Sequence, residues 1–195
     1  MPLVGLTGGL GAGKSTALEQ FALLGAAVLS TDDVVHELYE TDTVTGAVRE
    51  RFGDGVFDSS GRVDRRALGE RVFAQPAERE WLEALLWPLV AERTQHWHAQ
   101  LARLEPPPRA AIVETPLLFE AGGERRFAAT IAVVAADELR AARVAGRDQA
   151  ALGQRERRQL SQEEKAARAT YVVVNDGTVD QLRERLAAVL EAIGT

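Results

Sequence analysis

The chain has 195 residues, of which 46% are hydrophobic and 27% charged, a balance typical of soluble globular proteins. Its net charge of −6 argues against a general nucleic-acid binder, and the absence of cysteine excludes disulfides, thiolate metal sites and cysteine nucleophiles. No apolar stretch approaches the roughly 18 residues of a membrane span, and apolar residues from position 3 leave no room for a signal peptide. We therefore expect one cytoplasmic domain, with no membrane attachment and no obligate protein partner.

The first predicted elements are a strand, a glycine-rich loop and a helix. The apolar run at residues 3–6 predicts the strand, and residues 16–24 have a helical pattern. Between them, residues 8–15 read G-x-x-x-x-G-K-S, the phosphate-binding loop, in the strand–loop–helix context that this motif requires. A glycine-rich turn alone can be an ordinary connection, but such a turn does not need Lys and Ser directly after its last glycine.

This loop predicts a nucleoside polyphosphate and Mg²⁺ as ligands. Glycines let successive backbone N–H groups turn toward phosphate oxygens, and the helix that follows directs its positive end at them. Lys14 is expected to reach the outer phosphates, and the hydroxyl of Ser15 to ligate Mg²⁺. The predicted nucleotide-binding residues here are Gly8, Gly9, Gly11, Ala12, Gly13, Lys14, Ser15 and Thr16.

A long helical segment follows a second predicted strand. Residues 26–29 predict that strand, and the pattern from residue 31 to about 104 is helical, with turn signals near residues 53–55 and 59–61. An apolar stripe with helical spacing runs through residues 81–90 and should pack inward. Pro88 falls inside this stripe, so we expect a kink or break there.

Three more short apolar runs predict strands at residues 110–113, 130–134 and 171–174, before a closing amphipathic helix. Short apolar strands that alternate with helices indicate an α/β fold in which both faces of a parallel sheet are covered. We predict about five strands.

Residues 140–168 carry eight basic and four acidic side chains, so this segment has a net charge of +4 and the remainder −10. A local basic stretch on an acidic protein suits a polyphosphate ligand better than a long polyanion. The alternative is a solvated helix face with mixed ion pairs. Arg143 and Arg147 are four positions apart and share one helix face, where their planar guanidinium groups suit phosphate oxygens.

Many classes of protein use a phosphate-binding loop, so other residues are needed to distinguish between these classes. The GTPase motif N-K-x-D is absent, because the single Asn, Asn175, is followed by Asp176. Further motifs lie along the chain at residues 6–16, 28–36, 51–53, 61–68, 72–73 and 116–120, at Arg143, Arg147, Asp148, Arg155 and Gln159, and at residues 165–177. In these motifs, and along almost its whole length, the chain resembles dephospho-CoA kinases.

The resemblance implies transfer of phosphate from ATP to the ribose 3′-hydroxyl of dephospho-CoA, the last step of coenzyme A synthesis. It also implies a three-layer P-loop kinase fold that forms a single domain over residues 1–195. Within that domain, residues 33–104 would be a helical CoA-binding subdomain and residues 140–168 a lid. ATP and dephospho-CoA would be the small-molecule substrates, with Mg²⁺ as cofactor.

Asp32, just past the second predicted strand, is the candidate catalytic base. The carboxyl ends of parallel strands share one edge of the sheet, so its carboxylate can approach an acceptor hydroxyl near the phosphate loop. The alternative is that Asp32 only caps the next helix. Lys14 and Arg143 complete the predicted catalytic set.

Other candidates have weaker support. Glu114 ends the third predicted strand, where an acid can hold Mg²⁺ through water, or it is a surface carboxylate. Arg147 and Asn175 are predicted to contact ATP, although Asn175 also fits a plain turn. Three residues are predicted to contact the acceptor together with Asp32: His36, Leu117 and Arg155.

The chain departs from the family pattern at Ser30, Trp87 and Thr170, where Asp, His and Asp are usual, and between Arg147 and Gln159, where it looks a few residues short. Two other functions stay open: another small-molecule or nucleoside monophosphate kinase, and a nucleotide-dependent switch.

Overall fold

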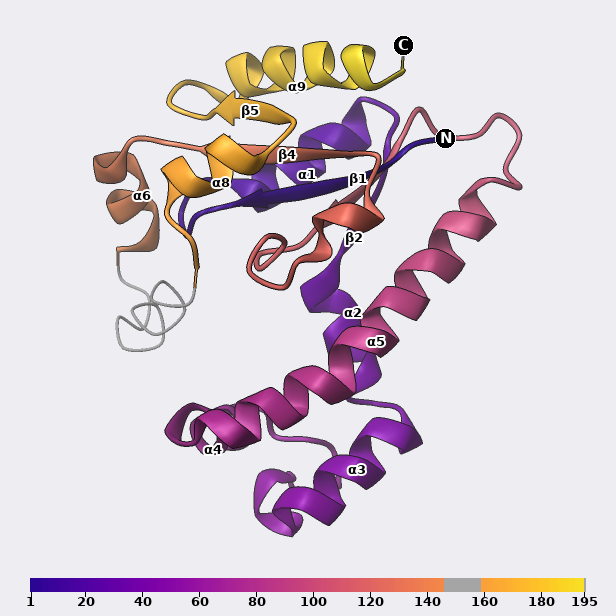
Figure 1. Cartoon of the computed structure of the whole chain (residues 1–195), viewed down its shortest axis with the longest axis vertical. Coiled ribbons are helices and arrows are strands. Elements are labelled where there is room, and N and C mark those ends of the chain that lie inside the picture. The colour runs from indigo at the N-terminus through magenta and orange to yellow at the C-terminus, as the bar shows by residue number, and fades with distance from the viewer. Residues whose placement is uncertain (146–158, 195) are drawn as a thin grey trace. The chain divides into compact units, whose positions relative to one another are not determined.

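The computed structural model describes residues 1–145 and 159–194 (Figure 1). The chain divides into two compact units. The first contains Met1–Ser30 and His98–Thr195, and the second contains Thr31–Trp97.

The first unit is built on a five-stranded parallel sheet with the order β2-β3-β1-β4-β5. Its strands are β1 (Leu3–Gly8), β2 (Ala27–Ser30), β3 (Ala111–Glu114), β4 (Ala129–Val134) and β5 (Tyr171–Val174). The five strands and their parallel pairing confirm the predicted fold class. The central strand β1 lies between β3 and β4, so the loop after β1 opens at the point where the strand order reverses, which is where ligands bind in such sheets.

One face of this sheet forms the main core. It is covered by α1 (Lys14–Leu23) and α9 (Val179–Gly194) (Figure 1). Leu182, Leu186 and Leu190 are spaced by four along α9, so they share one side of the helix and are almost fully buried. They pack with apolar residues from four strands and α1, including Val4, Leu6, Ile112, Ile131, Val133, Val173 and Phe21.

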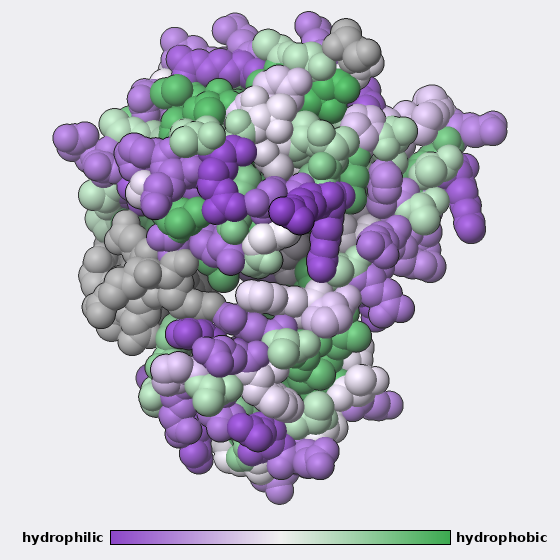
Figure 2. Space-filling model, in the orientation of Figure 1, coloured by the Kyte–Doolittle hydropathy of each residue, from purple (hydrophilic) through white to green (hydrophobic). Residues whose placement is uncertain are grey.

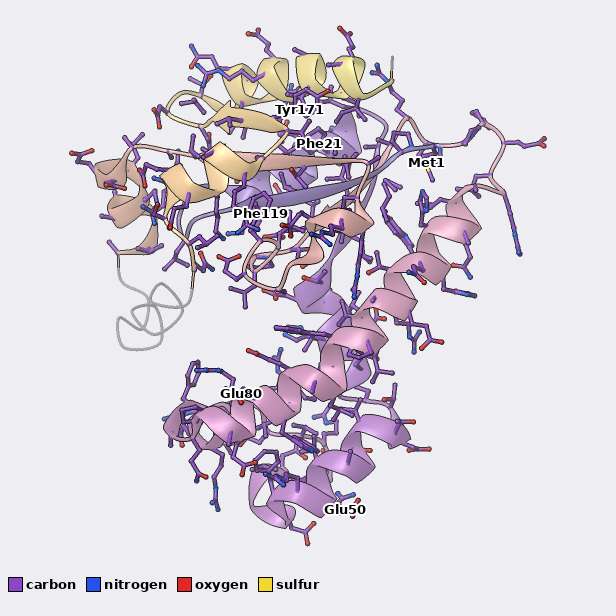
Figure 3. All side chains as sticks on the ribbon, viewed as in Figure 1. Met1, Phe21, Glu50, Glu80, Phe119 and Tyr171 are labelled. Atoms are coloured by element: carbon purple, nitrogen blue, oxygen red, sulfur yellow. The ribbon has the colours of Figure 1, made fainter. Side chains whose placement is uncertain are left out.

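The opposite face is covered by α8 (Gln162–Arg168) and by the chain between β3 and β4, which includes the short helix η2 (Gly123–Arg126). Phe21 and Phe119 mark the two sides of the sheet in Figure 3. At the edge of the sheet, Thr130 and Thr170 exchange hydrogen bonds between backbone N–H groups and side-chain hydroxyls at 3.0 and 3.1 Å. Thr170 thus ties the start of β5 to β4.

The second unit is helical. It contains α2 (Thr31–Leu38), α3 (Asp42–Phe52), η1 (Asp54–Val56), α4 (Arg65–Ala74) and most of α5 (Pro76–Leu101). Trp81 packs edge-on against Phe52 with ring centroids 5.5 Å apart, whereas Trp87 is 42% exposed. Asp64 begins α4 by accepting hydrogen bonds from the backbone N–H groups of residues 66 and 67.

Of the two alternatives predicted at Pro88, the break is wrong, because α5 runs without interruption across it, and the kink stays a prediction. A proline removes one hydrogen bond of the helix ladder, but a helix with packed residues on both sides of the proline can tolerate that loss. Leu82, Leu86 and Thr94 are buried on the two sides of Pro88.

Hydrophilic side chains predominate on the face of the molecule that Figure 2 shows, and the hydrophobic ones gather in small patches. None of the described helices combines the length and the apolar character that a membrane span requires.

The phenol of Tyr39 gives a pH-dependent test of the helical unit. Burial raises its pKa to about 12, while the charge of Arg65 acts in the opposite direction. An unfolded phenol ionises near pH 10, so between pH 10 and about 12 the unfolded chain releases this proton first, and stability falls as pH rises. We expect the free energy of unfolding, measured with urea, to fall less between pH 9.5 and 11.5 in Tyr39→Phe than in the wild type. Equal falls would contradict this assignment.

Candidate active site

Other segments of the chain pack tightly against the loop between β1 and α1. Gly11 and Gly13 have φ angles of 74° and 93°, in the left-handed region that favours glycine. A Cβ atom on Gly13 would collide with the side-chain amide of Asn175, and one on Gly11 would lie 2.7 Å from the carbonyl oxygen of Arg140. Both glycines are therefore required by backbone conformation and by the segments that press against the loop.

Asn175 holds this loop from the end of β5. Its side chain is 6% exposed, and its Nδ2 donates to the carbonyl of Ala12 at 2.8 Å. Its own backbone N–H donates to the carbonyl of Val134, in β4, at 2.7 Å. The next residue, Asp176, accepts a hydrogen bond from the backbone N–H of Ala136 at 2.8 Å. The segment after β5 is thus fixed both to the phosphate loop and to the end of β4.

Two arginines of α6 (Asp137–Val144) hold the same loop. Arg140 Nε donates to the carbonyl of Leu10 at 2.8 Å, and Arg143 donates to the carbonyl of Gly11 at 3.3 Å. Arg143 also donates to the backbone carbonyl of Asn175 at 2.9 Å. The structure therefore brings the predicted residues Arg143 and Asn175 together with the phosphate loop.

Three successive loop carbonyls, at residues 10–12, thus accept hydrogen bonds from outside the loop. In a trans peptide the C=O and the next N–H point in opposite directions. Holding the carbonyls of Leu10 and Ala12 on one side consequently turns the N–H groups of Gly11 and Gly13 toward the other. Converging N–H groups at a helix N-terminus are a site for anions such as phosphate.

The charged and hydroxyl groups of the motif lie at the start of α1. Lys14 is the first residue of this helix, and its Nζ donates to the carbonyl of Gly9 at 3.2 Å, so the side chain folds over the loop. Ser15 is exposed and Thr16 half-buried. The nucleotide-binding residues predicted from the motif therefore lie in one continuous segment, from the end of the central strand β1 to the first turn of α1.

Glu114 is buried at the end of β3, with 8% of its surface exposed. Its Cα is paired in register with Leu6 of β1 and with Ser30 of β2. This burial contradicts the alternative of a surface carboxylate, and it places the group at the edge of the sheet that also carries the phosphate loop.

The segment after β3 contacts α8. Leu117 is half-buried in this segment. Glu120 accepts a hydrogen bond from the backbone N–H of Leu160 at 2.7 Å and forms an ion pair with Lys165 at 3.1 Å. Burial lowers the pKa of the Lys165 ammonium, and the charge of Glu120 and its hydrogen bond oppose this effect.

A cavity of about 460 Å³ adjoins the phosphate loop. It is lined by Gly9, by Asp137 and Arg140 of α6, and by residues 159–164. The buried side chain of Gln162 forms part of this lining; its amide oxygen accepts from the backbone N–H of Ala135, and its Nε2 donates to the same residue's carbonyl, both at 2.9 Å.

Two predicted residues lie in the helical unit. Asp32 is exposed in the first turn of α2, directly after β2 in the chain. His36, one turn further on, is also exposed, and its Nε2 contacts the guanidinium of Arg65. Carboxylates near a helix N-terminus also favour the helix dipole, so the capping alternative for Asp32 stays open.

The predicted lid residues Arg147 and Arg155 lie outside the described residues. Arg140 has no predicted site role, although it lies three positions before Arg143 and thus on the same helix face. Within residues 1–145 and 159–194, no group of three or more His, Asp or Glu side chains is placed to hold a metal ion.

Comparison with known proteins identifies close relatives. The sequence model of the dephospho-CoA kinase family matches residues 2–181. Dephospho-CoA kinase from Syntrophotalea carbinolica is 34% identical to this chain over 97% of this chain and 91% of its own length. Dephospho-CoA kinase from Thiobacillus denitrificans is 38% identical over 95% of this chain and 92% of its own length.

Solved structures agree. TT1252 from Thermus thermophilus superposes with a TM-score of 0.81 at 36% identity, covering 98% of this chain and 97% of its own. Dephospho-CoA kinase from Campylobacter jejuni superposes with a TM-score of 0.72 at 25% identity, covering 98% of this chain and 96% of its own. Shikimate kinase from Aquifex aeolicus superposes with a TM-score of 0.54 at 12% identity, covering 97% of this chain and 96% of its own. At this identity it shows a shared fold only.

The contact between Asn175 and Ala12 predicts a binding defect. Removing the amide in Asn175→Ala leaves a buried loop carbonyl without this donor, a loss worth about 1–3 kcal/mol. We expect the Kd for ATP, measured by calorimetry, to rise about tenfold or more. Thr178→Ala, which removes a hydroxyl from the same connection without touching the loop, is the control and should bind normally. Equal affinities in Asn175→Ala and wild type would show that the loop keeps its shape without this contact.

Proposed function

Since the chain belongs to the dephospho-CoA kinase family, we propose that it transfers the γ-phosphoryl group of ATP to the ribose 3′-hydroxyl of dephospho-CoA. The observation that carries the proposal is the family match over residues 2–181, together with an intact phosphate loop at the carboxyl end of the central strand. Neither ATP nor the acceptor requires a protein partner in this scheme, and a cytoplasmic location stays a prediction.

The phosphate loop would bind ATP, the phosphate donor. The N–H groups turned inward by the outer hydrogen bonds would hold the β- and γ-phosphates, and the Lys14 ammonium would neutralise charge on the moving group. A pair of opposite charges 4 Å apart is worth about 1 kcal/mol in water and about 4 kcal/mol at an effective dielectric of 20. Exclusion of water from the site during the reaction would therefore strengthen this contact.

The oxygen groups near the loop fit magnesium, which prefers hard oxygen ligands together with phosphate and water. Ser15 offers an exposed hydroxyl and Glu114 a buried carboxylate at the same edge of the sheet. When bound, Mg²⁺ neutralises charge on the phosphates. Ser15 would ligate the ion directly, and Glu114 would hold it through water.

Asp32 is the proposed base. Its carboxylate would accept the proton of the 3′-hydroxyl, or orient that hydroxyl, as the oxygen attacks the γ-phosphorus and the bond to the β-phosphate oxygen breaks. His36 and Leu117 are proposed to contact the acceptor. Arg143 and the two lid arginines would contact the phosphates and the acceptor, which for Arg143 requires exchanging its present loop contacts.

The activity itself is tested with purified protein, ATP and Mg²⁺, with either dephospho-CoA or AMP as acceptor. The proposal predicts formation of CoA, identified by mass spectrometry. Transfer to AMP but not to dephospho-CoA would instead make the chain a nucleoside monophosphate kinase.

Lys14→Ala tests the donor side. Loss of a cation that stabilises the transferred phosphoryl group costs on the order of 10³-fold in rate, so we expect kcat for CoA formation to fall by at least that factor. Glu19→Ala changes an exposed side chain on the same helix and should keep normal turnover. Retained activity in the Lys14 variant would remove this residue from the mechanism.

Asp32→Asn tests the acceptor side. General-base catalysis contributes a factor of about 10²–10⁴ to the rate. We therefore expect kcat to decrease by a factor in that range, while the Kd for ATP stays within about twofold of the wild-type value. Its neighbour Asp33 provides a matched control, because Asp33→Asn makes the same change of charge in the same helical turn. If the two variants have similar turnover, Asp32 acts only as a helix-terminal carboxylate.

A further inference from the structure

Lys165 is a fully buried charged residue that the mechanism above does not use. Its side chain has 0% of its surface exposed. Its Nζ donates to the backbone carbonyl of Pro116 at 2.7 Å and forms the ion pair with Glu120 at 3.1 Å. Both partners belong to the segment that follows β3, so this one ammonium fixes two points of a single short stretch of chain.

These two points are connected to the rest of the site. The carbonyl of Pro116 also accepts a hydrogen bond from the hydroxyl of Thr7 at 3.3 Å, and Thr7 directly precedes Gly8 in β1. The carboxylate of Glu120 also accepts from the backbone N–H of Leu160, beside the cavity that adjoins Gly9. Lys165 therefore connects the segment 116–120 with two other places: with Thr7, just before the phosphate loop, and with Leu160, just before α8.

Stability alone does not account for this arrangement. Burial lowers the pKa of Lys165, because the charged form loses its hydration, and Glu120 only opposes that effect. Apolar side chains of similar size often stabilise a protein as well as a buried ion pair does, or better. What such a pair adds is fixed geometry: a charge-assisted hydrogen bond holds its partners in a narrow range of positions.

We propose that Lys165 is a positioning residue, which holds the segment 116–120 in the place where it contacts the phosphate acceptor. The inference rests on the proposed function. The segment leaves the carboxyl end of β3, next to the strand that carries the phosphate loop, and ligands of parallel sheets bind at this edge. It also contains Leu117, proposed above to contact dephospho-CoA.

The donor side depends on other contacts. The carbonyls of the phosphate loop are held by α6, by Asn175 and by Lys14 itself. A change at Lys165 should therefore disturb the acceptor more than ATP. A shift of about 1 Å in a bound group can lower a rate about 10²-fold.

The test compares Lys165→Met with the wild type in steady-state CoA formation. We expect kcat/KM for dephospho-CoA to fall by about tenfold to 10²-fold, while the Kd for ATP stays within about twofold. Arg183→Met is the control: it also removes a basic side chain, but from an exposed pair with Asp180 at 3.4 Å on α9, which covers the other face of the sheet. The control should keep its kcat/KM.

A double variant separates positioning from folding. Lys165→Met leaves Glu120 buried without its partner, which by itself can destabilise the fold. Adding Glu120→Gln removes the uncompensated charge and keeps an acceptor for the N–H of Leu160. The proposal predicts that the double variant has near-normal thermal stability but still the lowered kcat/KM for dephospho-CoA.

Recovery of normal kinetics in the double variant would overturn the proposal, because the pair would then serve stability only. Equal losses for ATP and for the acceptor would overturn it as well. These results differ from a failure of the proposed function, in which the wild-type protein itself forms no CoA.

Discussion

The site depends on hydrogen bonds made to the back of the phosphate loop. A loop that presents its N–H groups to a ligand must turn its carbonyls away, and buried carbonyls need donors. Arg140, Arg143 and Asn175 supply those donors to three successive carbonyls. The loop is thereby preorganised before any ligand arrives, so binding does not have to spend energy on ordering it.

The order of strands explains why these donors are available. With β1 between β3 and β4, the loop after β1 lies close to the chain that leaves β4 and becomes α6. The segment after β5 reaches the loop through Asn175, which is also bonded to β4. Apolar packing of α1 and α9 on one face keeps these strand ends in register. The opposite face carries the buried Lys165, which anchors the segment after β3.

Sequence patterns identified most of the fold because its signals are local. Each strand is a short apolar run, and all five occur within a few residues of the predicted ranges. The phosphate loop was identifiable for the same reason, since all its functional residues are consecutive. The break that was one of two alternatives predicted at Pro88 does not occur, because helix continuity there depends on the packing of α5, which a single-residue rule does not include.

The sequence by itself determined the phosphate-loop motif, the parallel sheet and the family, because these follow from contiguous motifs and from hydrophobic periodicity. Only the tertiary structure decided how the loop is held. Asn175 and Ala12 are 163 positions apart, and Arg140 and Leu10 are 130 apart. It also decided that Glu114 and Lys165 are buried. Hydrogen-bond partners so distant in the chain are set by which strand ends meet, and that adjacency is a property of the folded sheet.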